Sequence, residues 1–316
     1  MNTACRNNGH LVPRNLTALA ELIRRGELGA EILSQEEAHT RALSALAEEI
    51  AGRGVRAVML AGPSSSGKTT CAHRLSRQLA AMGLNPVAVS LDDYYIDRDK
   101  VRPEPDGTLD LEHINTIDVD RFRRDLAELL TGKEVTVPRF DFTTGRRHPS
   151  GRTILLRDGG VLIVEGIHGL NPLLLPEGAA DGMVYRLYIC PEYRFIAPDG
   201  TAVDDRDFRL LRRILRDWRT RGTSAAGTLG MWDSVGRGEA RWILPYRESA
   251  DGWFNSALSY EPAVLKARLR DLPAWETLSK AGGELERISR MLLALPGVQG
   301  HEAIPSDSIL REFIGM

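Results

Sequence analysis

The chain has 316 residues and a nearly balanced charge, with 41 Lys plus Arg against 43 Asp plus Glu. This length is enough for one large α/β domain with appended segments, or for two modest domains, so a sizeable core can be buried. The balanced charge argues against a protein whose main partner is a polyanion such as DNA. The three cysteines, Cys5, Cys71 and Cys190, form no CxxC pair, which argues against a disulfide framework or a zinc site.

No segment has the pattern of a membrane span or a secretion signal. Residues 1–16 are polar, and the most apolar stretch, 161–176, is interrupted by Glu165, His168 and Asn171. Together with the cysteine pattern, this predicts a soluble protein of the reducing cytoplasm that binds neither membrane nor nucleic acid.

The first 50 residues show helical periodicity. Leu16, Leu19 and Leu22 recur at the spacing of one helix face, and Ser34 with Glu37 has the form of a capping box that opens a second helix. We therefore expect an N-terminal helical extension over residues 1–50.

Strands and helices then alternate along the chain. The segments 55–61, 86–91 and 161–164 are short, apolar and rich in β-branched residues, as buried strands are, whereas 68–81 and 119–130 have helical periodicity. Such alternation predicts an α/β fold with a doubly wound parallel sheet.

A β-hairpin is expected to project from this sheet. Residues 135–142 and 153–156 are two short β-like runs, separated by the polar segment 143–152. After a further strand at 185–189 the chain is mainly helical, at 207–219, 261–269 and 284–295. The predicted organisation is thus a central domain over 51–272 and a C-terminal helical extension over 273–316.

The segment from Gly62 to Thr69 matches the phosphate-binding pattern G-x-x-x-x-G-K-[ST] and lies between a predicted strand and a predicted helix. Backbone amides of such a loop face phosphate oxygens, the lysine reaches the β- and γ-phosphates, and the threonine hydroxyl binds Mg²⁺. A glycine-rich turn with a chance lysine is the alternative, which the strand–loop–helix context disfavours. With this motif, the predicted doubly wound parallel sheet is of the P-loop NTPase type. The residues expected to bind ATP here are Gly62, Pro63, Ser64, Ser65, Ser66, Gly67, Lys68, Thr69 and Thr70.

A phosphate loop occurs in switch GTPases, motor ATPases and metabolite kinases alike, so other residues must decide between them. The sequence contains no Asn-Lys-x-Asp segment with which a GTPase would read guanine. A kinase needs a carboxylate that accepts the proton of the attacking hydroxyl, and Asp92 directly follows the second strand. Asp92, with Lys68, is the predicted catalytic residue, although an aspartate here could also simply cap a turn.

Two further groups complete the predicted site. Glu165 ends the strand 161–164 and could hold Mg²⁺ together with Thr69, unless it is an ordinary strand-terminal acid. Seven arginines occur between Arg206 and Arg221, and those of one helical face could form a lid over the nucleotide phosphates. The alternative is a solvated, purely structural arginine face.

Five ordered segments resemble those of the uridine kinase and phosphoribulokinase family. They are 62–69, 91–95 (LDDYY), 137–142 (VPRFDF), 162–167 (LIVEGI) and 212–217 with Arg221 and Gly222. The resemblance covers about residues 55 to 270, is strongest to bacterial uridine kinase-like nucleoside kinases, and extends to the segment 304–315.

The resemblance implies transfer of a phosphoryl group from ATP to the 5′-hydroxyl of a nucleoside, with Mg²⁺ as cofactor and an enzyme that is often a homo-oligomer. It makes Asp92 the general base and assigns Arg213, Arg216 and Arg221 to ATP phosphates or lid closure. The substrate-binding residues that it implies are Tyr95 at the nucleoside, Glu112 at the ribose hydroxyls, and Phe140 and Phe142.

The chain departs from the family where the base is read. The tyrosine and histidine that read the base align with Phe140 and Gly145, and a stacking phenylalanine aligns with Leu111; His148 and Arg147 are candidates to take over the reading. A kinase for another hydroxylated metabolite, such as a sugar phosphate, therefore stays open, as does, from a different class, an RNA-associated ATPase or nucleotide-binding regulator.

Overall fold

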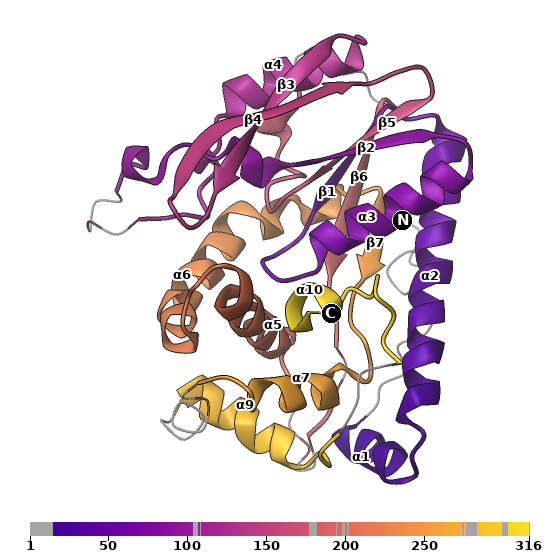
Figure 1. Cartoon of the computed structure of the whole chain (residues 1–316), viewed down its shortest axis with the longest axis vertical. Helices are drawn as coiled ribbons and strands as arrows, with labels where there is room; N and C mark the ends of the chain where they lie inside the picture. The colour runs from indigo at the N-terminus through magenta and orange to yellow at the C-terminus, as the bar shows by residue number, and fades with distance from the viewer. Residues whose placement is uncertain are drawn as a thin grey trace.

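A five-stranded parallel sheet forms the centre of the molecule (Figure 1). The structure, a computed structural model, describes residues 15–103, 107, 109–176, 182–193, 195–197, 200, 202–273, 275, 283–298 and 303–315. The strand order is β2 (Asn85–Ser90), β5 (Gly160–Glu165), β1 (Ala57–Ala61), β6 (Val184–Cys190) and β7 (Gly252–Asn255). All four pairings are parallel, which confirms the predicted fold class.

Both faces of the sheet are covered, because alternate side chains of β1 enter two different cores. Val58 and Leu60 belong to one buried cluster and Ala57 and Met59 to the other. A strand buried on both faces must be apolar throughout, which is why β1 has the form of an unbroken apolar run.

One face is covered by α4 (Val119–Leu130) and by the hairpin of β3 (Glu134–Asp141) and β4 (Arg146–Leu155). The predicted second hairpin strand, 153–156, was too short: β4 begins at Arg146, and only 142–145 forms the turn. The polar segment pairs with β3 through its backbone, and its largely exposed side chains need not be apolar.

The other face is covered by helices from both ends of the chain, and one buried cluster contains side chains from all of them. Helix α3 lies against the sheet, and the long helix α2 packs on α3 (Figure 1). These helices are α1 (Leu16–Arg24), α2 (Leu28–Arg53), α3 (Lys68–Ala81), α5 (Asp205–Thr220), α7 (Glu261–Leu269), α9 (Gly283–Leu293) and α10 (Arg311–Ile314).

The capping box predicted at Ser34 and Glu37 was wrong. Helix α2 runs without a break from Leu28 to Arg53, and both residues lie exposed within it. A capping box stabilises a helix end only where backbone amides lack partners, and inside a continuous helix those amides are already bonded.

Helix α6 (Ala225–Trp242) and strand β7 were not predicted. Helix α6 contains four glycines, which lowers its intrinsic helix propensity, and β7 has only four residues. Two of the glycines allow close packing, since a Cβ at Gly236 would collide with Arg206 and one at Gly238 with Glu112. The helix is therefore stabilised by tertiary contacts that a local pattern does not reveal.

Helix α2 is joined to the rest of the molecule by buried polar contacts. The Nε2 atom of His39 lies 3.0 Å from the carbonyl oxygen of Ala257, while its Nδ1 has no partner among the described residues. Arg74 of α3 donates to Glu36 at 3.2 Å. A neutral imidazole suits this setting, because a second proton would bring an unpaired charge into the core.

A search for a membrane-crossing helix found none with the needed length and apolar character in the part of the chain that the structure describes.

We expect acid to destabilise the fold through His39. Burial, and next the charge of Arg74, lowers the pKa of His39 to about 3 from 6.5. Between these values the unfolded chain binds the proton and the folded protein does not, so stability falls as pH drops below about 6.5. For this one group the loss between pH 7 and pH 5 should be about 2 kcal/mol.

Urea unfolding at both pH values tests this expectation with His39→Gln, whose amide can still donate to Ala257. The variant should lose less stability on acidification than the wild type. The matched control is His73→Gln on the exposed side of α3, which should leave the pH dependence unchanged. If the free energy of unfolding depends on pH in the same way in H39Q and in the wild type, His39 is not the source of the acid sensitivity.

Candidate active site

The phosphate loop follows β1 at the carboxyl edge of the sheet and leads directly into α3. Ser65 and Gly67 have φ values of 62° and 89°, so the backbone turns through the left-handed region twice. A Cβ at Gly62 would overlap the carbonyl oxygen of Ile189, and one at Gly67 would overlap Ile309. Both glycines are therefore required by close neighbours as well as by the turn.

Lys68, the first residue of α3, reaches back over the loop. Its Nζ donates to the carbonyl oxygen of Pro63 at 3.1 Å. Burial lowers the pKa of Lys68, whereas the negative charges of Glu165 and Asp92 act in the opposite direction. This half-buried ammonium group beside the loop, with Pro63 as its one hydrogen-bond partner among the described residues, provides positive charge for an anion.

Three arginines of α5 hold the loop from the other side. Arg209 donates to the carbonyl oxygen of Ser64 at 3.5 Å, and Arg212 to that of Ser65 at 3.3 Å. Arg213 donates to the Ser64 hydroxyl at 2.6 Å. These contacts position the loop relative to the arginine-rich helix.

The arginines of α5, together with Arg221 directly after the helix, do not all contact the same part of the molecule. Arg213, Arg216 and Arg221 line cavities at the site, and all three are ion-paired with Asp217. Arg206, which helical periodicity places on the same face as Arg213, instead donates to the carbonyl oxygen of Trp232 and does not line them.

Glu165 and Thr69 lie together at the end of β5. The Thr69 hydroxyl donates to Oε1 of Glu165 at 3.3 Å, and the Ser90 hydroxyl donates to the same atom at 2.7 Å. Burial raises the pKa of Glu165 to about 7, and the charge of Asp92 acts in the same direction. Hydroxyl and carboxylate oxygens are the donors that Mg²⁺ prefers, so this pair fits that ion.

Asp92 lies between two cavities. It belongs to a 3₁₀ turn, Leu91–Tyr94, that follows β2 and is capped by the Ser90 hydroxyl. One cavity, of about 230 Å³, is lined by residues of the phosphate loop together with Glu165, and the other has a volume of about 540 Å³. Lys68, Asp92, Arg216 and Arg221 line both, so the two spaces meet at these four side chains.

The larger cavity has an aromatic wall. The rings of Tyr95, Phe140 and Phe142 contact one another edge to face, with centroids 5.3 to 6.2 Å apart. Arg221 lies over the Phe142 ring at 4.2 Å. Burial raises the pKa of Tyr95 well above its usual value, so its hydroxyl stays protonated and can donate a hydrogen bond.

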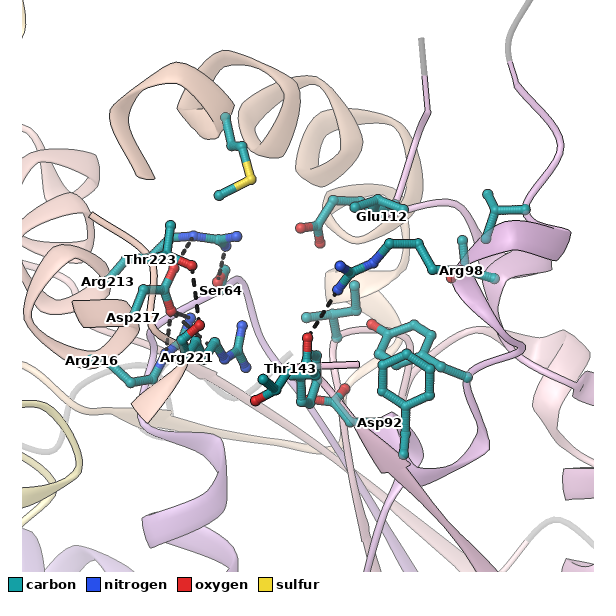
Figure 2. A pocket seen from close by; sticks show the side chains of 18 of the residues that line it. Ser64, Asp92, Arg98, Glu112, Thr143, Arg213, Arg216, Asp217, Arg221 and Thr223 are labelled. Atoms are coloured by element: carbon teal, nitrogen blue, oxygen red, sulfur yellow. Dashed lines mark hydrogen bonds and ion pairs between the residues drawn. The ribbon is translucent and has the colours of Figure 1, made fainter. Parts of the chain in front are cut away.

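Glu112 lines the same cavity, and Figure 2 shows its carboxylate directed into the space between Arg98 and Arg213. Burial raises its pKa. Its loop is held by Asp110, which accepts from the backbone N–H of Glu112 at 3.1 Å and from the indole of Trp242 at 2.9 Å. Helix α6 therefore positions this carboxylate.

Most of the predicted site residues line one or both cavities. The exceptions are Gly62, Pro63, Ser66 and Thr70. The two candidates for base reading, Arg147 and His148, do not line them either: Arg147 is ion-paired with Asp118 at 2.8 Å, and His148 is exposed on β4.

Several cavity residues were missed by sequence reasoning, and two of them, Arg98 and Glu312, carry charge close to the predicted site. Arg98 lies in a short turn without a recognisable motif, and only the folded hairpin brings it to the cavity. Glu312 belongs to α10, which packs on α5 near the phosphate loop (Figure 1). Its Oε2 accepts from the hydroxyl of Thr70 at 3.0 Å and from its backbone N–H at 3.3 Å. The family-like segment 304–315 was a signal for Glu312, although not for its contact.

A phosphate loop at the carboxyl edge of a parallel sheet, next to a carboxylate shared by two cavities, defines a P-loop phosphotransferase. Comparison with known proteins shows which family of phosphotransferases the chain resembles. Residues 57–172 match the sequence profile of the phosphoribulokinase / uridine kinase family.

Curated relatives agree with this match. The uridine kinases of Staphylococcus haemolyticus and Staphylococcus aureus are each 30% identical over 193 residues, which cover 61% of this chain and 83% of theirs. A solved structure from Silicibacter sp. TM1040, provisionally described as a fructose transport system kinase, has a TM-score of 0.51 at 24% identity. It covers 67% of this chain and 98% of that one, and it shows the shared fold. The chain belongs to the phosphoribulokinase/uridine kinase family.

Removing the charge of Glu312 should strengthen ATP binding. Its carboxylate occupies two donors of Thr70 at the start of α3 and adds negative charge next to the loop that receives phosphates. We expect Glu312→Gln to lower the Kd for ATP by about three- to tenfold at low salt.

Calorimetric titration with ATP measures this change. Asp307→Asn is the matched control, because it removes one negative charge from the same segment at a side chain that pairs with Arg77 instead. Weaker ATP binding by E312Q than by the wild type would show that the carboxylate supports the nucleotide.

Proposed function

We propose that the protein is a nucleoside kinase that transfers the γ-phosphoryl group of ATP to the 5′-hydroxyl of a nucleoside. One observation carries the proposal: Lys68, Asp92, Arg216 and Arg221 line both the phosphate-loop cavity and the larger aromatic cavity. A donor in the first space and an acceptor alcohol in the second would therefore meet at a carboxylate surrounded by cations.

On the donor side, the loop amides and Lys68 bind the β- and γ-phosphates. Arg213, Arg216 and Arg221 surround the space through which the phosphoryl group moves. Their ion pairs with Asp217 fix the guanidinium groups before the substrate binds, so little reorganisation is needed as charge develops.

On the acceptor side, Asp92 accepts the proton of the 5′-hydroxyl as its oxygen bonds to the γ-phosphorus. The bond from that phosphorus to the β–γ bridging oxygen breaks, and ADP leaves with the electron pair. Glu112 accepts hydrogen bonds from the ribose hydroxyls, and the rings of Tyr95 and Phe140 offer apolar contact to the nucleoside; the position of all three on the wall of the larger cavity supports these roles.

Thr69 and Glu165 would hold Mg²⁺, consistent with their oxygen donors and mutual contact. When bound, the ion neutralises charge on the phosphate oxygens. The cytoplasm, where ATP is supplied, suits such an enzyme.

A sugar phosphate is the second candidate acceptor. The larger cavity is lined by five cationic side chains against three carboxylates, which gives it a surplus of positive charge. An anionic alcohol would neutralise that surplus. The cations are Lys68, Arg98, Arg213, Arg216 and Arg221, and the carboxylates are Asp92, Glu112 and Asp217.

The proposal predicts that Asp92→Asn will lower kcat for nucleoside phosphorylation by about 10²- to 10⁴-fold, because the amide cannot accept the proton. Its Kd for ATP should stay near the wild-type value, since the loop and Lys68 are intact. Asp99→Asn, at an exposed carboxylate that pairs with Arg146, is the control and should be fully active.

Incubation with ATP, Mg²⁺ and a panel of nucleosides and sugar phosphates, followed by product analysis, identifies the acceptor. Nucleoside 5′-monophosphate is the expected product. If a sugar phosphate is turned over and no nucleoside is, the second candidate replaces the first.

A further inference from the structure

Arg98 lies on the wall of the larger cavity that faces the arginines of α5. Figure 2 shows its side chain across the cavity from Arg213 and Arg216, near Glu112. Its backbone N–H donates to the carbonyl oxygen of Gly145 at 2.8 Å. The turn that carries Arg98 is thus bound to the tip of the β3–β4 hairpin, and Arg98 does not line the phosphate-loop cavity.

Gly145 provides the room for this guanidinium group. A Cβ at position 145 would lie 3.1 Å from Cβ and 3.3 Å from Nε of Arg98, and φ at Gly145 is +68°. A side chain at this position would therefore be strained and would press on Arg98. The position of Arg98 therefore depends on a glycine at position 145.

The described residues of the protein use little of the hydrogen-bonding capacity of Arg98. One N–H donates to the carbonyl oxygen of Phe142 at 3.2 Å. The neighbouring carboxylates pair elsewhere, Asp97 with Lys100 and Asp99 with Arg146, and Arg98 makes no ion pair with any described residue. A guanidinium group has five N–H donors and no acceptor, so several donors are available to a ligand.

The surroundings of Arg98 suit a flat, partly polar ligand. Phe142, whose carbonyl oxygen Arg98 contacts, belongs to the aromatic wall with Tyr95 and Phe140. Arg221 covers the Phe142 ring, which leaves the other two rings for the ligand. Aromatic rings beside a group that only donates hydrogen bonds are a suitable site for a nucleobase with carbonyl oxygens on its edge.

We infer that Arg98 is the specificity-determining residue for the acceptor base and reads a carbonyl oxygen on its edge. This inference rests on the proposed nucleoside kinase activity. Since Arg98 can only donate, it favours uracil, whose position 4 carries an acceptor oxygen, over cytosine, whose position 4 carries a donor amino group. By the same reasoning it favours guanine or hypoxanthine, with O6 and N7 as adjacent acceptors, over adenine.

The test compares kcat/KM for uridine and cytidine, and for inosine and adenosine, in the wild type and in two variants. We expect the wild type to prefer uridine over cytidine and inosine over adenosine by about tenfold or more. In cytidine and adenosine an amino group replaces the carbonyl oxygen, and its N–H donors would face the N–H donors of Arg98. Arg98→Gln should bring the ratio close to one, since an amide both donates and accepts. Arg98→Lys should give an intermediate ratio, because the charge remains and the planar fork is lost.

Arg146→Gln is the matched control. Arg146 is exposed on the same hairpin, pairs with Asp99 and does not line the cavity, so its loss should leave the ratios unchanged. Thermal unfolding of R98Q should match the wild type, because this exposed side chain makes only one hydrogen bond to the residues that the structure describes.

The outcomes separate the inference from the proposed function. If nucleosides are phosphorylated but R98Q keeps the wild-type ratios, the inference is wrong and the kinase activity stands. If the wild type phosphorylates no nucleoside, both fail. If a sugar phosphate is the only acceptor and R98Q raises its KM, Arg98 binds an anion, which overturns base reading.

Discussion

The site depends on the way the carbonyl groups of the phosphate loop are held from outside. Arg209 and Arg212 bind the carbonyl oxygens of Ser64 and Ser65, and the Ser256 hydroxyl binds that of Ser66 at 2.6 Å. Because a trans peptide points its N–H opposite to its carbonyl, each such bond turns the following N–H away from the supporting residues. Amides that bind phosphate are thus oriented before any nucleotide enters, and preorganised donors need little rearrangement during reaction.

This support is itself anchored in the core. Arg212 and Glu261 are fully buried and joined by two bonds of 2.5 and 2.7 Å, and Arg212 also donates to the carbonyl oxygen of Ser256 at 2.9 Å. Burying two charges is costly, and leaving either one unpaired is costlier still, by about 3 to 5 kcal/mol. These contacts therefore hold the loop, α5 and the segment between β7 and α7 together as one unit. Because burying the charges is costly, the pair contributes more to the fixed geometry of the phosphate loop than to the stability of the fold.

Helix α5 shows where periodicity misleads. The pattern places Phe208, Leu211 and Leu215 with Trp218 on one apolar face, yet Trp218 is 41% exposed whereas Arg212 is completely buried. An arginine enters a core when a carboxylate and carbonyl groups from other segments satisfy it, and those partners lie about 50 and 150 residues away in sequence. The run is not a uniform solvated face, because Arg212 is buried in the core whereas Arg213, Arg216 and Arg221 line the larger cavity. A lid role for these arginines stays a prediction.

The sequence by itself determined the strand–loop–helix unit around Lys68, the bounds of α4 and α7, the carboxylate at Asp92 and the kinase class. These features follow from local rules of periodicity, turn geometry and amide orientation, and local rules leave local patterns. Only the tertiary structure decided that Arg98 lines the larger cavity and that Glu312 meets the start of α3. Their positions result from packing between segments that are about 45 to 240 residues apart, and such contacts leave no periodic signal in the chain.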